Sequence, residues 1–234
     1  MTDSRPALVT LHVWRVPPWR VPSALARVAT DRRRVRRMPG LRFAKLVGTG
    51  SGATFTVRDS EPTRWALLCA WAGRDCAAAF EESATAARWH RIAAERWRGD
   101  LVPLTSRGRW SGREPFGRPE AIRWAGPVAA LTRARLVPRR ALAFWRAVPP
   151  VSADLRRAGG LRASLGIGEL PIGLQGTFSV WDSAADLRRF AYGSPAHVEA
   201  IRRTAQVQWY AEELFATFAV VGSSGTLSGC DPLA

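Results

Sequence analysis

"SRGRWSGREPF" at residues 106–116 and "SSGTLSGCDPL" at residues 223–233 carry serine, glycine and proline at the same five spacings. The two stretches lie 117 residues apart, which is half of this 234-residue chain. Serine, glycine and proline are typical of tight turns. A shared turn sequence at the end of each half therefore indicates an internal duplication, and we expect the two halves to have the same fold.

Working back from each turn, both halves show the same order of expected elements. Each half begins with an alternating apolar strand that ends at a proline. In the first half we expect strands at 8–17, 40–50, 64–71 and 101–106, and helices at 21–37 and around Trp97. In the second half we expect strands at 128–138, 160–170, 174–181 and 215–223, and helices at 139–157 and around Trp209. The helix at 139–157 is expected to be interrupted at Pro149 and Pro150. Trp71 and Trp181 end matching strands, and Phe80 and Phe190 each follow nine residues later.

The order strand, helix, strand, strand, helix, strand is that of a ferredoxin-like unit. Its sheet carries helices on one face and leaves the other face apolar, so two units can bury those faces against each other. We therefore predict an α+β fold in which tandem ferredoxin-like repeats form a pseudo-dimeric α+β barrel within one chain. The repeats are expected at 1–112 and 127–234, with a connector at 113–126.

The chain contains eleven tryptophans, which is many for its length. We expect most of them to fill the core with bulky aromatic area. A tryptophan-rich core of this architecture would also leave room for a flat apolar ligand between the sheet and helix layers.

The formal net charge is +16, and Lys45 is the only lysine, so 34 basic residues are arginines. A field of this sign attracts nucleic acids or anionic lipid headgroups. Nucleic acid is disfavoured as a partner because the aromatic residues follow strand and helix core spacing and are not interleaved with the arginine run at 31–37.

Three cysteines without CxxC spacing indicate neither a disulfide framework nor a zinc site. The sequence shows no secretory signal and no apolar run of the roughly 20 residues that a membrane-spanning helix needs. We expect a cytoplasmic protein whose membrane contact, if it has one, is peripheral and at the inner face of the membrane.

His197 is the candidate metal ligand. Ser194 and Pro195 suit the cap and first position of a helix, which places His197 in its first turn. The positive end of the helix dipole disfavours imidazolium and favours the neutral ring that binds metals. Ile201 and Thr204 follow on roughly the same helix face, so the ring is expected to point into the protein. The sequence leaves open the alternative of a partly exposed histidine at a helix start.

The other candidate ligands are weaker. His90 is expected on a helix surface and His12 within a strand, and no two histidines have the i, i+4 spacing of a multi-imidazole site. Cys76, expected at a helix start that favours a thiolate, is a distant second choice as an iron ligand. Cys69 reads as a small core residue.

Two further motifs have a simple structural explanation. "GTGSGA" at 48–53 resembles a phosphate-binding loop, but a strand signal follows it instead of a helix, so we interpret it as a hairpin loop. "DRRRVRR" at 31–37 has the composition of a site for phosphate or lipid headgroups, whereas a basic helix end is usually a solvated face.

Several long blocks of the sequence resemble the spheroidene monooxygenase family of carotenoid-modifying enzymes and its actinobacterial relatives, over about residues 7–233. The blocks are "FAKLVGTG", "RWALLCAW", "ERWRGDLVPLTSRGRWSGREPFG", "GPVAALTRARL", "FWRAVPPV", "GIGELPIGLQGTFSVW" and "RTAQVQWYAEELFATFAV". The resemblance implies an oxygen-dependent hydroxylase or ketolase that acts on the end of an acyclic carotenoid. It also implies haem iron as cofactor, an external electron donor such as a ferredoxin, and a barrel related to the haem-binding dimeric α+β barrels.

In those haem barrels the iron ligand tends to be a histidine on a helix of the second half, and His197 is the position that fits. The second repeat is thus the candidate haem-binding half. Arg203, Tyr210 and Gln175 lie in the best-matching blocks and are expected to hydrogen-bond bound oxygen or a haem propionate. For Arg203, an ion pair with Glu199 one turn earlier is the open alternative.

The sequence thus leaves three hypotheses. The leading one is a haem-dependent monooxygenase with a hydrophobic isoprenoid substrate. The second is oxygen chemistry in the barrel without a cofactor. The third is a basic ligand-binding or nucleic-acid-binding barrel without catalysis.

Overall fold

A computed structural model describes residues 5–53, 59–120, 122–169 and 174–234. The first half contains β1 (Leu8–Arg15), the short 3-10 helix η1 (Pro18–Arg20), α1 (Val21–Arg36), β2 (Leu41–Gly50), β3 (Ser60–Trp71), α2 (Arg74–Glu81), α3 (Ala84–Ile92) and β4 (Glu95–Gly108). The second half contains β5 (Val128–Leu136), η3 (Pro138–Arg140), α4 (Ala141–Arg157), β6 (Leu161–Gly168), β7 (Leu174–Trp181), α5 (Ala184–Gly193), α6 (Pro195–Val207) and β8 (Tyr210–Gly225).

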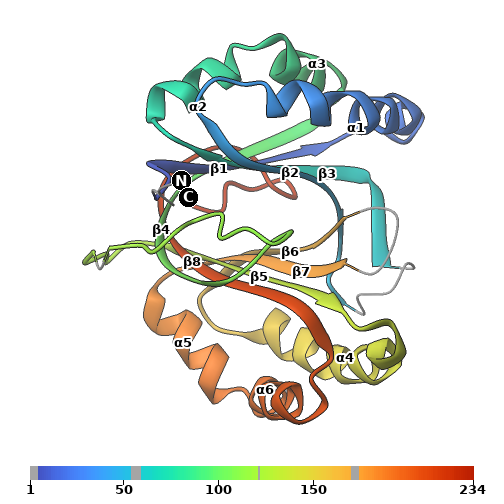
Figure 1. Ribbon diagram of the computed structural model, residues 1–234, viewed down its shortest axis with the longest axis vertical. Helices are drawn as coiled ribbons and strands as arrows, with labels where there is room; N and C mark the ends of the chain where they lie inside the picture. Colours follow the sequence, from blue (N-terminus) through green and yellow to red (C-terminus); the bar gives the residue numbers. More distant parts are fainter. Residues whose placement is uncertain (1–4, 54–58, 121, 170–173) are drawn as a thin grey trace.

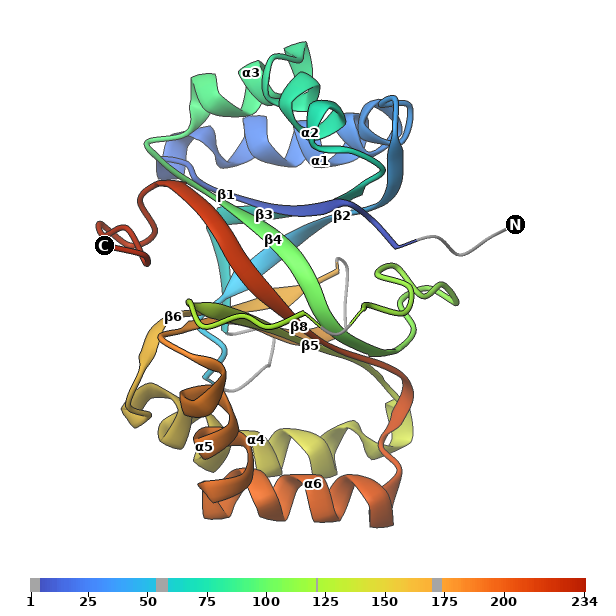
Figure 2. The ribbon, with the colours of Figure 1, turned by 90° about the vertical axis from the view of Figure 1, so that its left-hand side faces the viewer.

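The eight strands form one closed barrel in the order β1-β3-β2-β6-β7-β5-β8-β4. The halves are joined at two seams, where β2 pairs with β6 and β4 pairs with β8. Helices α1 to α3 cover one side of the barrel and α4 to α6 cover the opposite side (Figure 1). In the turned view, β4 and β8 run side by side between the two helix layers (Figure 2). The predicted pseudo-dimeric α+β barrel is confirmed.

Side chains fill the interior of the barrel. Most come from alternate positions of all eight strands, as the period of two along a strand requires, and Trp110, Phe116 and Leu227 come from the segments that follow β4 and β8. The interior cluster comprises Val9, Leu11, Val13, Phe43, Val47, Ala66, Leu68, Ala70, Trp97, Leu101, Trp110, Phe116, Ala129, Leu131, Leu165, Ile167, Phe178, Val180, Leu214, Ala216, Phe218, Val220 and Leu227. The barrel is therefore a packed core.

The duplicated turns have the same backbone geometry. Ser111 and Ser228 have φ angles of 55° and 60°, and Gly108 and Gly225 have φ angles of 96° and 81°. The matching aromatic pairs also make matching contacts, because the ring centroids of Trp71 and Phe80 are 5.6 Å apart and those of Trp181 and Phe190 are 5.4 Å apart. The repeat inferred from the turns is thus present in the structure.

Three details differ from the sequence-based expectations. The second helix of each half is split in two, into α2 and α3 and into α5 and α6. Trp97 lies on β4 and Trp209 lies just before β8, so neither is helical. Helix α4 continues through Pro149 and Pro150, which both lie on its exposed side, where water can bond the carbonyl groups that proline leaves without a donor.

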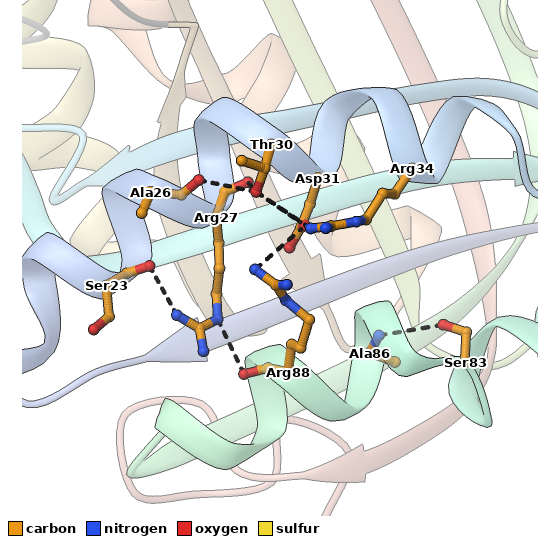
Figure 3. A network of polar contacts seen from close by, with 9 residues as sticks. All are labelled: Ser23, Ala26, Arg27, Thr30, Asp31, Arg34, Ser83, Ala86 and Arg88. Carbon is orange, nitrogen blue, oxygen red and sulfur yellow. Dashed lines mark hydrogen bonds and ion pairs between the residues drawn. The ribbon is translucent and has the colours of Figure 1, made fainter.

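A polar network joins helix α1 and helix α3 in the first half (Figure 3). Asp31 on α1 is fully buried and accepts a hydrogen bond from Arg34 at 2.6 Å, and its Oδ1 lies 3.9 Å from Nη2 of Arg88 on α3. Arg27 donates to the backbone carbonyl of Arg88 at 3.1 Å and to that of Ser23 at 2.9 Å. Asp31, within the predicted solvated stretch 31–37, is therefore an internal anchor, whereas its arginine neighbours at 32 and 33 are exposed.

None of the helices in the described part of the chain is long and apolar enough to cross a membrane.

Candidate functional site

Equivalent positions on the outer faces of the two half-sheets carry side chains of very different size. In the first half, Trp14 on β1 pairs with Trp65 on β3. At the same point in the register of the second half, Ala134 on β5 pairs with Gln175 on β7. One step along these strands, the first half has His12 beside Leu67, whereas the second half has Thr132 beside Thr177.

Large side chains fill the helix layer of the first half. The ring of Trp14 stacks on Trp89 of α3, with centroids 4.9 Å apart and an interplanar angle of 20°. Both indoles are 1% exposed. The buried members of this layer are Leu8, Trp14, Val16, Ala24, Val28, Val35, Leu46, Trp65, Leu67, Cys69, Trp71, Ala77, Phe80, Ala86, Trp89 and Ile92.

The second tryptophan of the stacked pair, Trp89, is also replaced in the second half. Ser83 caps α3 by accepting from the backbone N–H of Ala86 at 3.2 Å, and Ser194 caps α6 by accepting from that of His197 at 3.2 Å. Trp89 follows its cap by six residues, and the sixth residue after Ser194 is Ala200. Two alanines, Ala134 and Ala200, thus stand where the first half has two stacked indoles.

The helix layer of the second half, which we call the C-terminal layer, comprises the outer faces of β5 and β7 with α4, α5 and α6. Among the described side chains, α5 and α6 bury none completely. Thr132 remains exposed although its strand has a neighbour on each side. The buried apolar cluster of this layer is Leu136, Phe144, Val148 and Trp209. Small side chains and loose packing make the C-terminal layer the candidate site for a flat ligand.

His197 lies at one end of the C-terminal layer. The fully buried Trp181 of β7 stacks on Phe190 of α5, and the His197 ring centroid is 5.0 Å from that of Phe190. Its Nδ1 lies 2.7 Å from the carbonyl oxygen of Ala191. A carbonyl only accepts, so Nδ1 carries a proton, and in the neutral ring Nε2 then keeps the lone pair. This is the tautomer in which a histidine coordinates a metal through Nε2.

The structure places His197 in the helix layer, and it corrects the expectation that Ile201, on the same helix face, points into the protein. The ring is half-buried in the helix layer outside the barrel, so it does not point into the barrel interior. Ile201, expected on the inward side of α6, is 47% exposed. Any ligand of this imidazole would therefore lie between helices and sheet, in the location that the sequence predicted for a flat apolar molecule.

Tyr210 lies at the other end of the layer. It pairs with Leu136, whereas Trp181 pairs with Val128, and these two β5 residues are about 27 Å apart at 3.4 Å per residue. The Tyr210 ring contacts Phe144 at a centroid distance of 5.8 Å. Burial raises the pKa of its phenol, although hydrogen bonding to Thr204 opposes the shift. The structure therefore separates Tyr210 from His197.

Arg203 lies midway along α6 and is half-buried. Glu199 forms its ion pair with Arg202, through two contacts of 2.8 Å, so the predicted alternative partner of Arg203 is bonded to another arginine. The backbone of Gln175 pairs with Ala134 on β5, but its side chain lies outside the described residues.

One buried polar group in this layer has no partner among the described residues. The indole Nε1 of Trp145 on α4 is buried without a hydrogen-bond acceptor. Such groups are rare in native proteins because an unpaired donor costs free energy. An acceptor on a bound molecule would satisfy it.

The other candidate ligands lie in the helix layer of the first half. The described residues contain no group of three or more histidine, cysteine, aspartate or glutamate side chains that could hold a metal. His12 is fully buried, with its Nδ1 3.1 Å from Oε1 of Glu81, and burial lowers its pKa to about 3. Burial also raises the pKa of the Cys69 thiol. Cys76 packs against the position of Gly40 in the helix layer of the first half.

Comparison with known proteins places the chain in a family, although no family model matches it. The chain is 36% identical to spheroidene monooxygenase of Rhodobacter capsulatus, over 92% of this chain and 90% of the relative. The chain belongs to the spheroidene monooxygenase family. A second member, from Rubrivivax gelatinosus, is 37% identical over 82% of this chain and 73% of that relative. The predicted family and the prediction of an oxidoreductase are thereby confirmed.

A solved structure supports the fold of this spheroidene monooxygenase family member. An aldoxime dehydratase, solved in complex with butyraldoxime, matches 91% of this chain and 79% of its own with a TM-score of 0.61 and 13% identity. That likeness concerns the fold alone. Family membership favours the enzymatic hypotheses over the non-catalytic barrel.

Sequence reasoning selected His197 as a candidate but did not select the small residues of the C-terminal layer. Ala134 and Ala200 carry no chemical signal of their own. Their significance follows from the aligned repeats, in which "LVTLHVW" at 8–14 corresponds to "VAALTRA" at 128–134 and shows tryptophan replaced by alanine.

Proposed function

We propose that the protein is a haem-dependent monooxygenase that hydroxylates or ketolates a hydrophobic isoprenoid such as an acyclic carotenoid. The cofactor is assigned to the C-terminal layer. The observation that carries this assignment is the replacement of the stacked pair Trp14 and Trp89 by Ala134 and Ala200, because it removes two flat ring systems from an otherwise repeated architecture.

The side chains of the layer fit the chemistry of haem. His197 would hold the haem iron, since its Nδ1 proton is bonded to the Ala191 carbonyl and Nε2 of the neutral ring is left to bind a metal. Arg203 would pair with a propionate, as an arginine fork suits a carboxylate. Gln175 stays a predicted cofactor contact. When bound, haem would supply the iron that activates oxygen, with electrons from an external donor such as a ferredoxin.

Tyr210 would act at the far end of the layer. Because burial raises its pKa, the phenol stays protonated at neutral pH and can donate a hydrogen bond. Phe144 and Trp209 pack around it with ring centroids 5.7 Å apart and form an apolar wall. We assign this end to the substrate, because it combines aromatic area with one polar donor. The names of the relatives support a carotenoid as that substrate.

An absorption spectrum tests the proposal. Purified protein titrated with haem should develop a Soret band with a stoichiometry of one. His197→Ala should abolish the band or shift it to that of weakly held haem, whereas the control His90→Ala, in α3 of the first half, should leave it unchanged. An unchanged band in His197→Ala would refute the assignment of His197 as the iron ligand. Activity in iron-free protein would instead support the cofactor-free alternative.

A blocking variant tests the location separately from the ligand. Ala200→Trp restores the indole found in the first half and should prevent haem uptake while the protein remains folded. Ala86→Ser, at the position equivalent to His197 in the first half, is a control that should bind haem normally. Haem bound equally well by Ala200→Trp would mean that the cofactor lies elsewhere.

A further inference from the structure

The beginning of α1 exposes two large apolar side chains. Trp19 on η1 is 76% exposed and Leu25 on α1 is 48% exposed. Pro22, Ala26 and Ala29 are exposed along the same part of the chain. Helix α1 belongs to the helix layer that covers the first half of the barrel (Figure 2). An exposed indole at a helix start is typical of proteins that insert it into a membrane interface.

The fold does not require an indole at this place. The short helix η3 repeats η1 in the second half, and Arg139 stands at the position of Trp19 there. Arg139 is exposed as well. A solvated arginine therefore satisfies this position, so the exposed Trp19 has no structural explanation within the chain.

The end of the same helix is strongly basic. Arg32, Arg33, Arg36 and Arg37 are all exposed, and none of them forms an ion pair within the described part of the chain. Arg34 is the arginine of this run that is neutralised, by Asp31 at 2.6 Å. The outer face of α1 thus joins an apolar beginning to four free positive charges.

The exposed apolar residues of α6 do not lie beside a comparable run of free arginines. Val198 and Ile201 on α6 are 45% and 47% exposed. The neighbouring Arg202 is paired with Glu199, and on α5 Arg189 is paired with Asp186. Charge therefore distinguishes the α1 face from the α6 face.

A cavity of about 200 Å³ lies beside the basic end of α1. Its lining includes Arg32 and Arg36, the buried apolar side chains of Leu46 and Leu67, and Lys45, which is paired with Glu169 at 2.9 Å. The two arginines therefore supply the free positive charge of this hollow. A hollow that combines cationic and apolar walls suits the headgroup and upper chain of an anionic lipid.

We propose that the outer face of α1, from Trp19 to Arg37, docks the protein on an anionic lipid bilayer. Trp19 and Leu25 enter the interface, and the four arginines contact the headgroups. The net charge of +16 adds a long-range attraction to the same surface. This inference is independent of the haem proposal, because it concerns the opposite helix layer and is measured without haem.

Flotation with vesicles tests the docking face. The full chain should bind vesicles of phosphatidylglycerol and phosphatidylcholine, release them at high salt, and ignore vesicles of phosphatidylcholine alone. The double variant Trp19→Ser with Leu25→Ser should lower binding about tenfold or more, since it removes the inserted apolar area. Arg33→Gln with Arg37→Gln should lower binding roughly 25-fold, at about fivefold for each headgroup contact.

Two matched controls use the opposite layer. Val198→Ser with Ile201→Ser removes two exposed apolar side chains from α6, and Arg139→Gln with Arg146→Gln removes the same charge from the side of α4. Both should change binding less than about threefold, because long-range attraction alone is affected. All of these positions are exposed, so thermal unfolding should confirm that each variant is folded.

Three results would overturn the proposal. These are normal binding by the Trp19 and Leu25 variant, an equal loss in the α6 control, and equal binding to neutral vesicles. Absence of vesicle binding by the unaltered chain would also overturn the proposal, and would leave the basic end of α1 to an acidic protein partner.

Discussion

Glu95 and Glu212 stand at equivalent positions in the two halves, and each carboxylate holds the turn that belongs to the other half. Glu212 accepts hydrogen bonds from the backbone N–H groups of Ser111 at 3.0 Å and Gly112 at 2.7 Å. Glu95 accepts from the backbone of Gly229 at 2.6 Å and from the hydroxyl of Thr226 at 3.1 Å. The two turns thus have the same geometry because each binds a glutamate at the equivalent position of the other half.

The two glutamates should nevertheless differ in their effect on stability. Glu212 also forms an ion pair with Arg133. The Arg133 side chain is 3% exposed, and its guanidinium lies over the ring of Trp110. Glu212→Ala should therefore lower the free energy of unfolding by about 3–5 kcal/mol, because it leaves a buried cation unpaired. Glu95 pairs with Arg15 at 3.6 Å, but that arginine is 42% exposed, so Glu95→Ala should cost about 1–2 kcal/mol, mostly for the lost turn bonds. Urea unfolding measures both, and equal losses would show that Arg133 does not depend on Glu212.

The free energy of unfolding should fall as the pH drops from about 6.5 toward 3, because His12 is buried as the neutral ring. Burial, with Arg98 and His90 adding repulsion, lowers its pKa to about 3. The unfolded chain binds a proton near pH 6.5 and the folded chain does not, so the stabilisation is full above pH 6.5 and is lost on acidification. The slope should approach about 1.4 kcal/mol per pH unit. Urea unfolding at stepped pH should show a shallower dependence in His12→Asn over this interval.

Exchanging tryptophan and alanine between the layers should have opposite effects on stability. Trp89→Ala removes one ring of a buried stacked pair and should lower the free energy of unfolding by about 3–5 kcal/mol. Ala200→Trp should not destabilise the ligand-free protein, because the loosely packed C-terminal layer has room for the ring. Thermal unfolding of the two variants without haem compares them directly. A large loss of stability in Ala200→Trp would mean that side chains already fill the layer.

Alanine should be tolerated at one glycine of each turn and not at the other. A Cβ at Gly108 would lie 2.2 Å from the carbonyl oxygen of Glu213, and one at Gly225 would lie 2.2 Å from that of Arg96. Both substitutions should prevent folding or cost more than about 3 kcal/mol, since the backbone must move. Gly112→Ala and Gly229→Ala meet no atom within 4 Å and should cost about 1–2 kcal/mol for their positive φ. Soluble yield and urea unfolding of the four variants check this ranking.

The sequence predicted the fold because the signals it used are local and occur twice. Proline-ended strands, matched tryptophans and the two turns each mark an element boundary, and the second copy confirms the first. The sequence analysis predicted a helix around Trp97 where the structure has β4, and this error has a physical cause. Residues 95–103 bury every second side chain, which is the period of a strand, and the arginines between them resemble a solvated helix face.

The candidate site was predictable in part. The cap residue Ser194 placed His197 in a first helical turn, because capping depends on neighbours in sequence. Its distance from Tyr210 was not predictable, since that distance depends on the pairing of β5 with β7 and β8. The ion pair of Arg133 with Glu212 likewise depends on strand pairing across 79 residues.

The exchanged turns also bear on how such a chain arose. Neither half can complete the hydrogen bonds of its own final turn, so an ancestral single copy would have needed a second copy to close its ends. The same reciprocity predicts complementation today. Fragments 1–120 and 122–234, produced together, should associate into a heterodimer that gel filtration detects, whereas each fragment alone should aggregate.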